Sequence, residues 1–190
     1  MNKRSILATA LGIALGAVAF VPPAAMAADG TITITGQLTA ATCTIKVNGG
    51  SNNATVTLPT MQTSDFTTSG TAAGYTAFTI ALSSCQAGGA GVNSVLPYFE
   101  QGPTTDLNTG YLKNATGTGN ATNVEVMLST SNTIASALQL QKPANSQGGT
   151  LTAQGLTSNP SFTYYASYIS TGAATAGAVS TSVQYDLSYQ

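Results

Sequence analysis

The side chains that carry most enzyme chemistry are scarce in this sequence. It contains no histidine, two cysteines and six acids among 190 residues. Without histidine, neither the Ser-His-Asp and Cys-His arrangements nor most zinc sites can be built. The acids Asp65, Glu100, Asp106 and Glu125 stand apart, without the spacing of a calcium loop or a carboxylate pair. We interpret them as solvated surface charges, and the sequence predicts no catalytic residue, metal site or cofactor.

The overall composition narrows the possible partners further. Charged residues make up only 6% of the chain, and the net charge is −1. So few basic residues cannot neutralise a row of phosphates, which argues against nucleic-acid binding. A hydrophobic content of 43% argues against disorder. The length fits one domain with a sizeable core.

The first 27 residues have the three parts of a secretory signal peptide. Lys3 and Arg4 precede an apolar run from Ile6 to Val21, and Ala25-Met26-Ala27 supplies the small-residue end. A membrane anchor is the alternative, but this run is shorter than the roughly 20 residues that cross a bilayer. We expect cleavage after Ala27, export, and no membrane span in the mature chain.

The two cysteines, Cys43 and Cys85, both follow this segment. In an oxidising compartment, two cysteines most simply form one disulfide. A redox pair or two metal ligands are the alternatives, but redox pairs usually have C-x-x-C spacing and two thiols without histidine are too few for a zinc site. The pair is therefore interpreted as a structural bridge. Closing a loop of this length would stabilise the fold by about 4 kcal/mol in the chain-entropy model.

Several stretches alternate apolar and polar residues with a period of two, which predicts half-buried strands. They run from Ile32 to Leu38, Phe78 to Leu82, Val124 to Leu128, Phe162 to Tyr168 and Val183 to Tyr189. Segments rich in glycine and asparagine lie between them and predict turns. Many short strands joined by such turns indicate an all-β sandwich.

The first and last of these stretches lie at the ends of the mature chain. A terminal strand with one apolar face must find a sheet, or it remains an edge that invites pairing with another chain. The linker Thr39-Ala40-Ala41-Thr42 separates the first stretch from the rest, so that stretch need not fold back on its own body. The alternative is that it forms the first strand of a complete sandwich.

The order of these pieces resembles the pilins assembled by the bacterial chaperone–usher pathway, of the type 1 fimbrial kind. The stretch 31–38, followed closely by Cys43, looks like the N-terminal extension of that family, and Cys85 falls where its second cysteine is expected. The segment 170–177 is similar to the one before the family's final strand. Gly177 lies fourteenth from the end and Tyr189 is penultimate, which matches the family's C-terminal pattern.

The resemblance implies an incomplete immunoglobulin-like sandwich that a donor strand from a neighbouring subunit completes. It divides the chain into a signal peptide (1–27), a donor-strand extension (28–39) and a pilin domain (40–190). The donor residues are then Ile32, Ile34, Gly36 and Leu38. The residues of the C-terminal groove strand, which contact a chaperone or another subunit, are Gly177, Val183, Tyr185, Leu187 and Tyr189.

The function implied by the resemblance is that of a structural subunit of a surface fimbria, which polymerises by donor-strand exchange and supports adhesion. Its partners would be other pilin subunits in a homopolymer, a periplasmic chaperone and an outer-membrane usher. Export would lead through the periplasm to the cell surface. The alternatives are a carbohydrate-binding adhesin or a minor adaptor pilin at the fimbrial tip.

Overall fold

The computed structural model describes residues 32–36, 38–89, 91–149 and 151–190. The predicted signal peptide and its cleavage site after Ala27 lie outside the described residues. The chain divides into two units, one ending at Gln37 and the other running from Leu38 to Gln190. Strands and core belong to the second unit.

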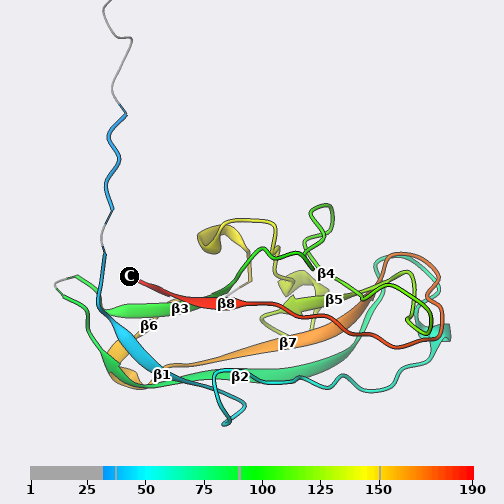
Figure 1. The fold of residues 1–190 in the computed structure, drawn as a ribbon, viewed down its shortest axis with the longest axis horizontal. Coiled ribbons are helices and arrows are strands. Elements are labelled where there is room, and N and C mark those ends of the chain that lie inside the picture. The colour runs from blue at the N-terminus through cyan, green and yellow to red at the C-terminus, as the bar shows by residue number, and fades with distance from the viewer. Residues whose placement is uncertain (1–31, 37, 90, 150) are drawn as a thin grey trace, which may run out of the picture. The chain divides into compact units, whose positions relative to one another are not determined.

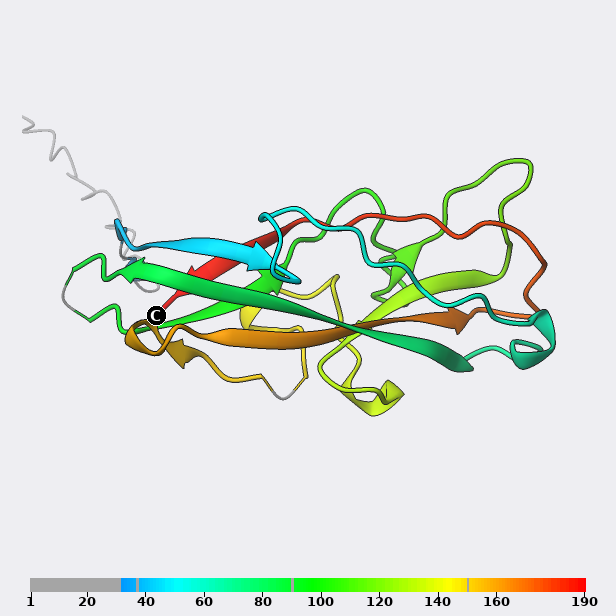
Figure 2. The ribbon, with the colours of Figure 1, turned by 90° about the horizontal axis from the view of Figure 1, so that it is seen from below.

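Two antiparallel sheets make up the second unit (Figures 1 and 2). The larger sheet has the order β1 (Thr42–Val47), β2 (Ala72–Gln86), β7 (Ser161–Ser170), β5 (Val124–Ser129) and β4 (Leu112–Lys113). The smaller sheet has the order β6 (Gln154–Gly155), β3 (Ser94–Phe99) and β8 (Tyr185–Tyr189). The prediction of an all-β sandwich is confirmed.

The described helices are four short 3-10 turns in the connections between strands. They are η1 (Thr63–Asp65), η2 (Ile134–Ser136), η3 (Ala144–Ser146) and η4 (Leu156–Ser158). None of the described helices has the length and apolar character needed to cross a bilayer.

Aromatic side chains from both sheets meet in the core. Phe78 of β2 and Tyr164 of β7 come from the larger sheet, and Phe99 of β3 comes from the smaller one. The ring centroids of Phe99 and Tyr164 lie 4.9 Å apart at 81°, and those of Phe78 and Tyr164 lie 5.7 Å apart. These are the edge-to-face and stacked arrangements that aromatic pairs prefer. The alternating apolar residues predicted for β2 and β7 therefore hold the two sheets together.

Strand β5 differs from its prediction as a half-buried strand, because all six of its residues are buried. The interpretation of Glu125 as a solvated charge is wrong, since only 6% of this residue is exposed. The hydroxyl of Thr109, in the loop before β4, donates a hydrogen bond of 2.8 Å to its carboxylate. Burial raises the pKa of Glu125. Alternation within one strand carries no information about a loop that covers its outer face.

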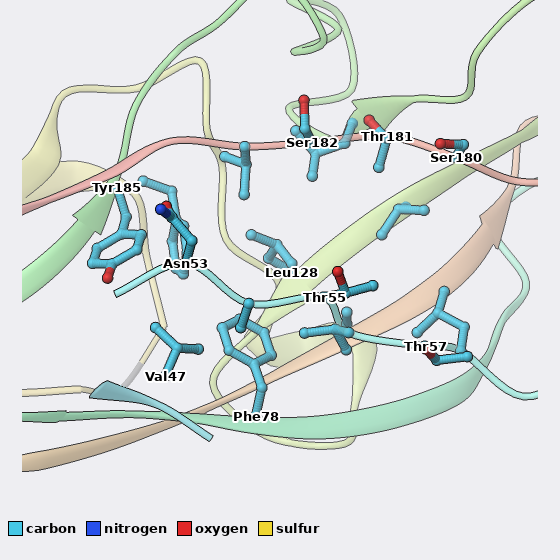
Figure 3. A pocket seen from close by; sticks show the side chains of 18 of the residues that line it. Val47, Asn53, Thr55, Thr57, Phe78, Leu128, Ser180, Thr181, Ser182 and Tyr185 are labelled. Atoms are coloured by element: carbon cyan, nitrogen blue, oxygen red, sulfur yellow. The ribbon is translucent and has the colours of Figure 1, made fainter. Parts of the chain in front are cut away.

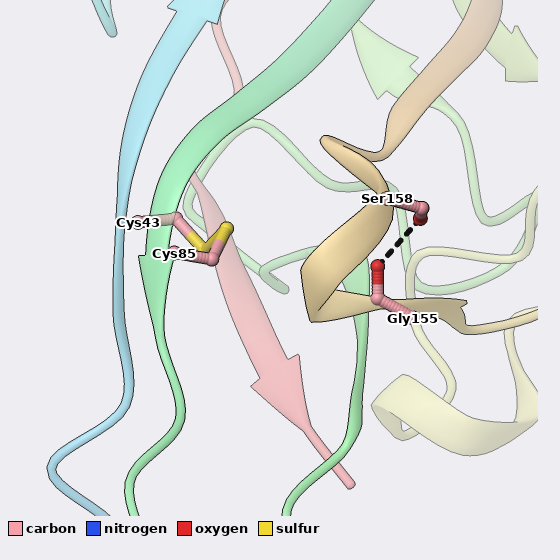
Figure 4. The surroundings of a disulfide bond; sticks show 4 residues. All are labelled: Cys43, Cys85, Gly155 and Ser158. Atoms are coloured by element: carbon pink, nitrogen blue, oxygen red, sulfur yellow. Dashed lines mark hydrogen bonds between the residues drawn. A yellow bond between two sulfur atoms is a disulfide. The ribbon is translucent and has the colours of Figure 1, made fainter.

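The disulfide joins neighbouring strands (Figure 4). Cys43 of β1 bonds to Cys85 of β2, with a Cα–Cα distance of 4.1 Å. The bridge lies where the pairing of β1 with β2 shifts register, between Thr42 and Thr44. It therefore ties β1, an edge strand of the larger sheet, to its neighbour β2.

The first alternating stretch, from Ile32 to Leu38, differs from the other predicted strands. The described residues 32–36 and 38–41 contain no strand, and β1 begins only at Thr42. The structure therefore does not show this stretch as the first strand of a complete sandwich. At the other end, β8 begins at Tyr185, two residues later than the alternation suggests.

A candidate strand-binding groove

A groove with a cavity volume of about 600 Å³ runs between two extended segments (Figure 3). Residues 52–58, which follow β1, form one side and are called the first flank. Residues 179–185, which lead into β8, form the other side and are called the second flank. In Figure 3 the chain at Asn53 and Thr55 faces the chain at Ser180 and Ser182 across the opening.

The floor of the groove is the inner face of the larger sheet. Its side chains come from β2, β4, β5 and β7, with one from β3, and they are Phe78, Ile80, Phe99, Leu112, Val126, Leu128 and Ala166. The flanks add the half-buried Val56 and Leu58 on one side and Val179 and Val183 on the other. The groove is therefore apolar along its base, and no charged side chain lines it.

The second flank directs half of its backbone groups away from the groove. The carbonyl oxygen of Ser180 accepts from the Ala115 N–H at 2.9 Å, and that of Gln184 accepts from the Glu100 N–H at 2.9 Å. Backbone groups in an extended chain alternate in direction. Those of residues 179, 181 and 183 consequently point the other way, toward the groove. None of them has a hydrogen-bond partner among the described residues.

Most of the first flank is unpaired as well. Within the described part of the chain, the backbone groups of residues 54–58 have no hydrogen-bond partner. The buried hydroxyl oxygen of Thr181 on the second flank also lacks one. Unpaired buried polar groups are rare in folded proteins, because each one costs free energy. Two facing rows of free N–H and C=O groups over an apolar floor are what a sheet presents when one strand is absent.

One side chain crosses the groove at the β8 end. The hydroxyl of Tyr185 donates a hydrogen bond of 2.7 Å to the carbonyl oxygen of Asn52, which joins the two flanks. Burial raises the pKa of Tyr185, which favours the neutral phenol that donates this hydrogen bond.

A smaller pocket of about 300 Å³ continues the groove at its other end. Tyr168 and Val179 line both cavities. Gly177 lies at this second pocket, and a Cβ atom there would stand 2.3 Å from the backbone nitrogen of Ala121. Only glycine allows the two backbones to come this close.

The residues predicted for the C-terminal groove strand are divided between these places. Val183 and Tyr185 line the groove, and Gly177 lines the smaller pocket. Leu187 and Tyr189 are half-buried against the core and line neither. The sequence analysis missed the first flank entirely. Its signal is short, since only Val56 and Leu58 alternate there with threonines.

The predicted donor residues lie in the open. The side chains of Ile32, Ile34 and Leu38 are 89%, 91% and 100% exposed. Gly36 has open space where a Cβ atom would be. Large aliphatic side chains are seldom exposed so completely at alternate positions.

Comparisons with known proteins show the family of this chain. The family model "Type-1 fimbrial protein, A" matches residues 58–190. The chain belongs to this family. The fimbrial subunit is 43% identical to the major fimbrial subunit SMF-1 of Stenotrophomonas maltophilia, over 90% of this chain and 99% of that protein. It is 36% identical to the F17 fimbrial protein of Escherichia coli, over 88% of this chain and 91% of that one.

Among solved structures, the P pilus rod subunit PapA aligns with 84% of this chain and 100% of its own, at a TM-score of 0.46 and 19% identity. The family and its relatives confirm the fimbrial interpretation of the sequence. The chain is a structural subunit of a fimbria, a filament of the cell surface, and it polymerises with other pilin subunits.

Proposed function

We propose that this subunit polymerises by donor-strand exchange, in which the extension 28–39 of one copy fills the groove of the next. The observation that carries the proposal is the pair of unpaired backbone edges, 54–58 and 179–183, facing each other over an apolar floor. An inserted strand would hydrogen-bond to both edges and place alternate side chains on the floor.

The lengths of the three segments agree. The donor stretch from Ile32 to Leu38, the first flank and the second flank each contain seven residues. At about 3.3 Å per residue, each spans roughly 20 Å when extended. One donor stretch is therefore long enough to span the unpaired parts of both flanks.

The apolar side chains of the donor provide most of the driving force. Burial of Ile32, Ile34 and Leu38 would contribute about 4–9 kcal/mol before ordering costs. Gly36 occupies the remaining inward position, where the missing side chain suits a shallow point of the groove. The backbone of an inserted strand would also bring polar groups to the unpartnered hydroxyl of Thr181.

This contact produces a filament and requires no catalysis. Donor and acceptor lie at different places on one chain, so the contact is heterologous and leaves a free donor and a free groove at the two ends of every assembly. Before assembly, a periplasmic chaperone would occupy the groove, and an outer-membrane usher would receive the subunit after removal of the segment 1–27. The subunit would act without a cofactor.

The test uses a chain that can accept a strand but not donate one. Ile34→Asp in the full chain places a charge in the donor stretch and leaves the groove intact. We expect a peptide with the sequence of residues 28–39 to raise the melting temperature of this variant strongly. The matched control is the same peptide carrying Ile34→Asp, which should have no effect. Equal melting temperatures with and without the wild-type peptide would contradict the proposal.

A further inference from the structure

One edge of strand β3 pairs with β8 along most of its length. On the opposite edge, the backbone groups of β3 find hydrogen-bond partners without a full neighbouring strand. Strand β6 pairs with only two residues of β3, Ser94 and Val95. Just before them, the carbonyl of Asn93 accepts from the Leu156 N–H at 2.9 Å. Beyond Val95, the four remaining residues of β3 lie without a neighbouring strand on this side.

Each remaining backbone group on this side of β3 is either absent or has its own hydrogen-bond partner. Pro97 has no N–H to offer, and its carbonyl oxygen accepts a hydrogen bond of 3.1 Å from the hydroxyl of Tyr164. The next residue whose backbone groups point away from β8 is Phe99. Its N–H donates to Oε1 of Gln147 at 3.3 Å, and its carbonyl oxygen accepts from Nε2 of the same side chain.

Gln147 thus acts as a one-residue substitute for a strand. Its amide presents an acceptor and a donor side by side, as a backbone peptide group does in a sheet. The residue is only 5% exposed, although it belongs to the loop between β5 and β6. A glutamine this deeply buried is uncommon, and both of its polar atoms are bonded to β3.

We propose that Gln147 blocks strand addition at the β3 edge, so that a donor strand enters the groove and not this second edge of the smaller sheet. The inference rests on donor-strand exchange as the mode of assembly. Open sheet edges pair readily with extended chains, and the concentration of donor stretches in a growing fibre is high. A second accepting edge would allow branched or dead-end assemblies.

The blocking role predicts a change in stoichiometry. In the Ile34→Asp chain, a labelled peptide of residues 28–39 should bind once. Adding Gln147→Leu, which keeps the bulk of the side chain but removes its hydrogen bonds, should allow a second peptide to bind or cause self-association of the peptide-filled subunit. Gln147→Ala is the second variant. Gln141→Leu is the matched control, since Gln141 lies in the same loop and its described hydrogen bond goes to Gln139.

Hydrogen exchange provides the local readout. The Phe99 amide should exchange about tenfold faster in both Gln147 variants, the effect of about one lost hydrogen bond. The Glu100 amide, which bonds to Gln184 on the opposite edge, should stay protected. Sedimentation velocity and peptide titration give the number of accepting edges.

The outcomes separate the two proposals. If Ile34→Asp binds no peptide, donor-strand exchange fails and the inference fails with it. If it binds one peptide and the Gln147 variants also bind only one without associating, donor-strand exchange stands and the blocking role is overturned. Faster exchange at Phe99 with unchanged stoichiometry also overturns it, because Gln147 would then only stabilise its loop.

Discussion

The segment that leads into β8 and the far side of β3 differ in how their backbone groups are hydrogen-bonded. On one side, residues 179, 181 and 183 leave their backbone groups without a partner in the described structure, opposite residues 54–58, which are also unpaired. On the other side, the outward groups of β3 are satisfied by a two-residue strand, a proline, the phenol of Tyr164 and the amide of Gln147. Unpaired edges are unfavourable in a finished fold, and under the proposed donor-strand exchange the edge that remains open is the place of assembly.

The largest effect should come from removing the disulfide bond that closes the chain loop containing the first flank. The first flank lies inside the chain loop that the Cys43–Cys85 bridge closes, and no strand pairs with it. Cys43→Ser or Cys85→Ser should each lower the free energy of unfolding by about 4 kcal/mol. Urea unfolding of each variant measures this loss. Midpoints equal to that of the wild type would show that the disulfide bond does not stabilise the subunit.

A smaller effect is expected from placing a polar group on the open edge. Val183→Asn puts an amide against the apolar floor, at a cost of about 1–3 kcal/mol when it lacks a partner. In the Ile34→Asp chain, the affinity for the 28–39 peptide should fall about tenfold to a hundredfold. Gln184→Asn is the control, because Gln184 is exposed and does not line the groove. Equal affinities of the two variants would show that Val183 does not contact the bound peptide.

The bond between the flanks tests how firmly the open side is held apart. Tyr185→Phe removes the hydrogen bond to Asn52 and keeps the ring. We expect a loss of about 1 kcal/mol in the peptide-free subunit, or about 2–4 °C in melting temperature. The control is Tyr165→Phe, since the hydroxyl of Tyr165 has no hydrogen bond among the described residues. If both variants melt alike, the bond contributes nothing.

The smallest effect concerns the carboxylate of Glu125, a buried polar group that has a hydrogen-bond partner, as the backbone groups of the β3 edge do. Because burial raises the folded-state pKa of Glu125 above 4.5, the protonated form favours folding. Glu125→Gln should therefore be more stable than the wild type at pH 7, by up to about 2–4 °C for an effect of about 1 kcal/mol. The difference should vanish as the pH falls below 4.5. Thermal unfolding between pH 3 and 8 measures it, and a pH-independent difference would contradict the role of charge.

Much of the fold was accessible from pattern alone. Alternation in β2 and β7 identified the inner face of the larger sheet, because Phe78, Ile80, Phe162 and Tyr164 are buried as a period of two requires. The predicted cysteine pair forms the disulfide bond. Alternation failed at Glu125, since burial there comes from a distant loop. It also missed the first flank, where two apolar residues are too few to distinguish from a loop.

From the sequence alone come the predicted export segment, the cysteine pair, the strand faces and an alternating apolar stretch near the N-terminus. These depend on local composition and on the two-residue period of extended chains. Only the tertiary structure decided which backbone groups are left unpaired. Hydrogen-bond partners such as Gln147 for Phe99, or Ala115 for Ser180, come from residues far apart in the chain. Whether an edge is open or closed is therefore a property of the folded chain, and here that difference locates the groove.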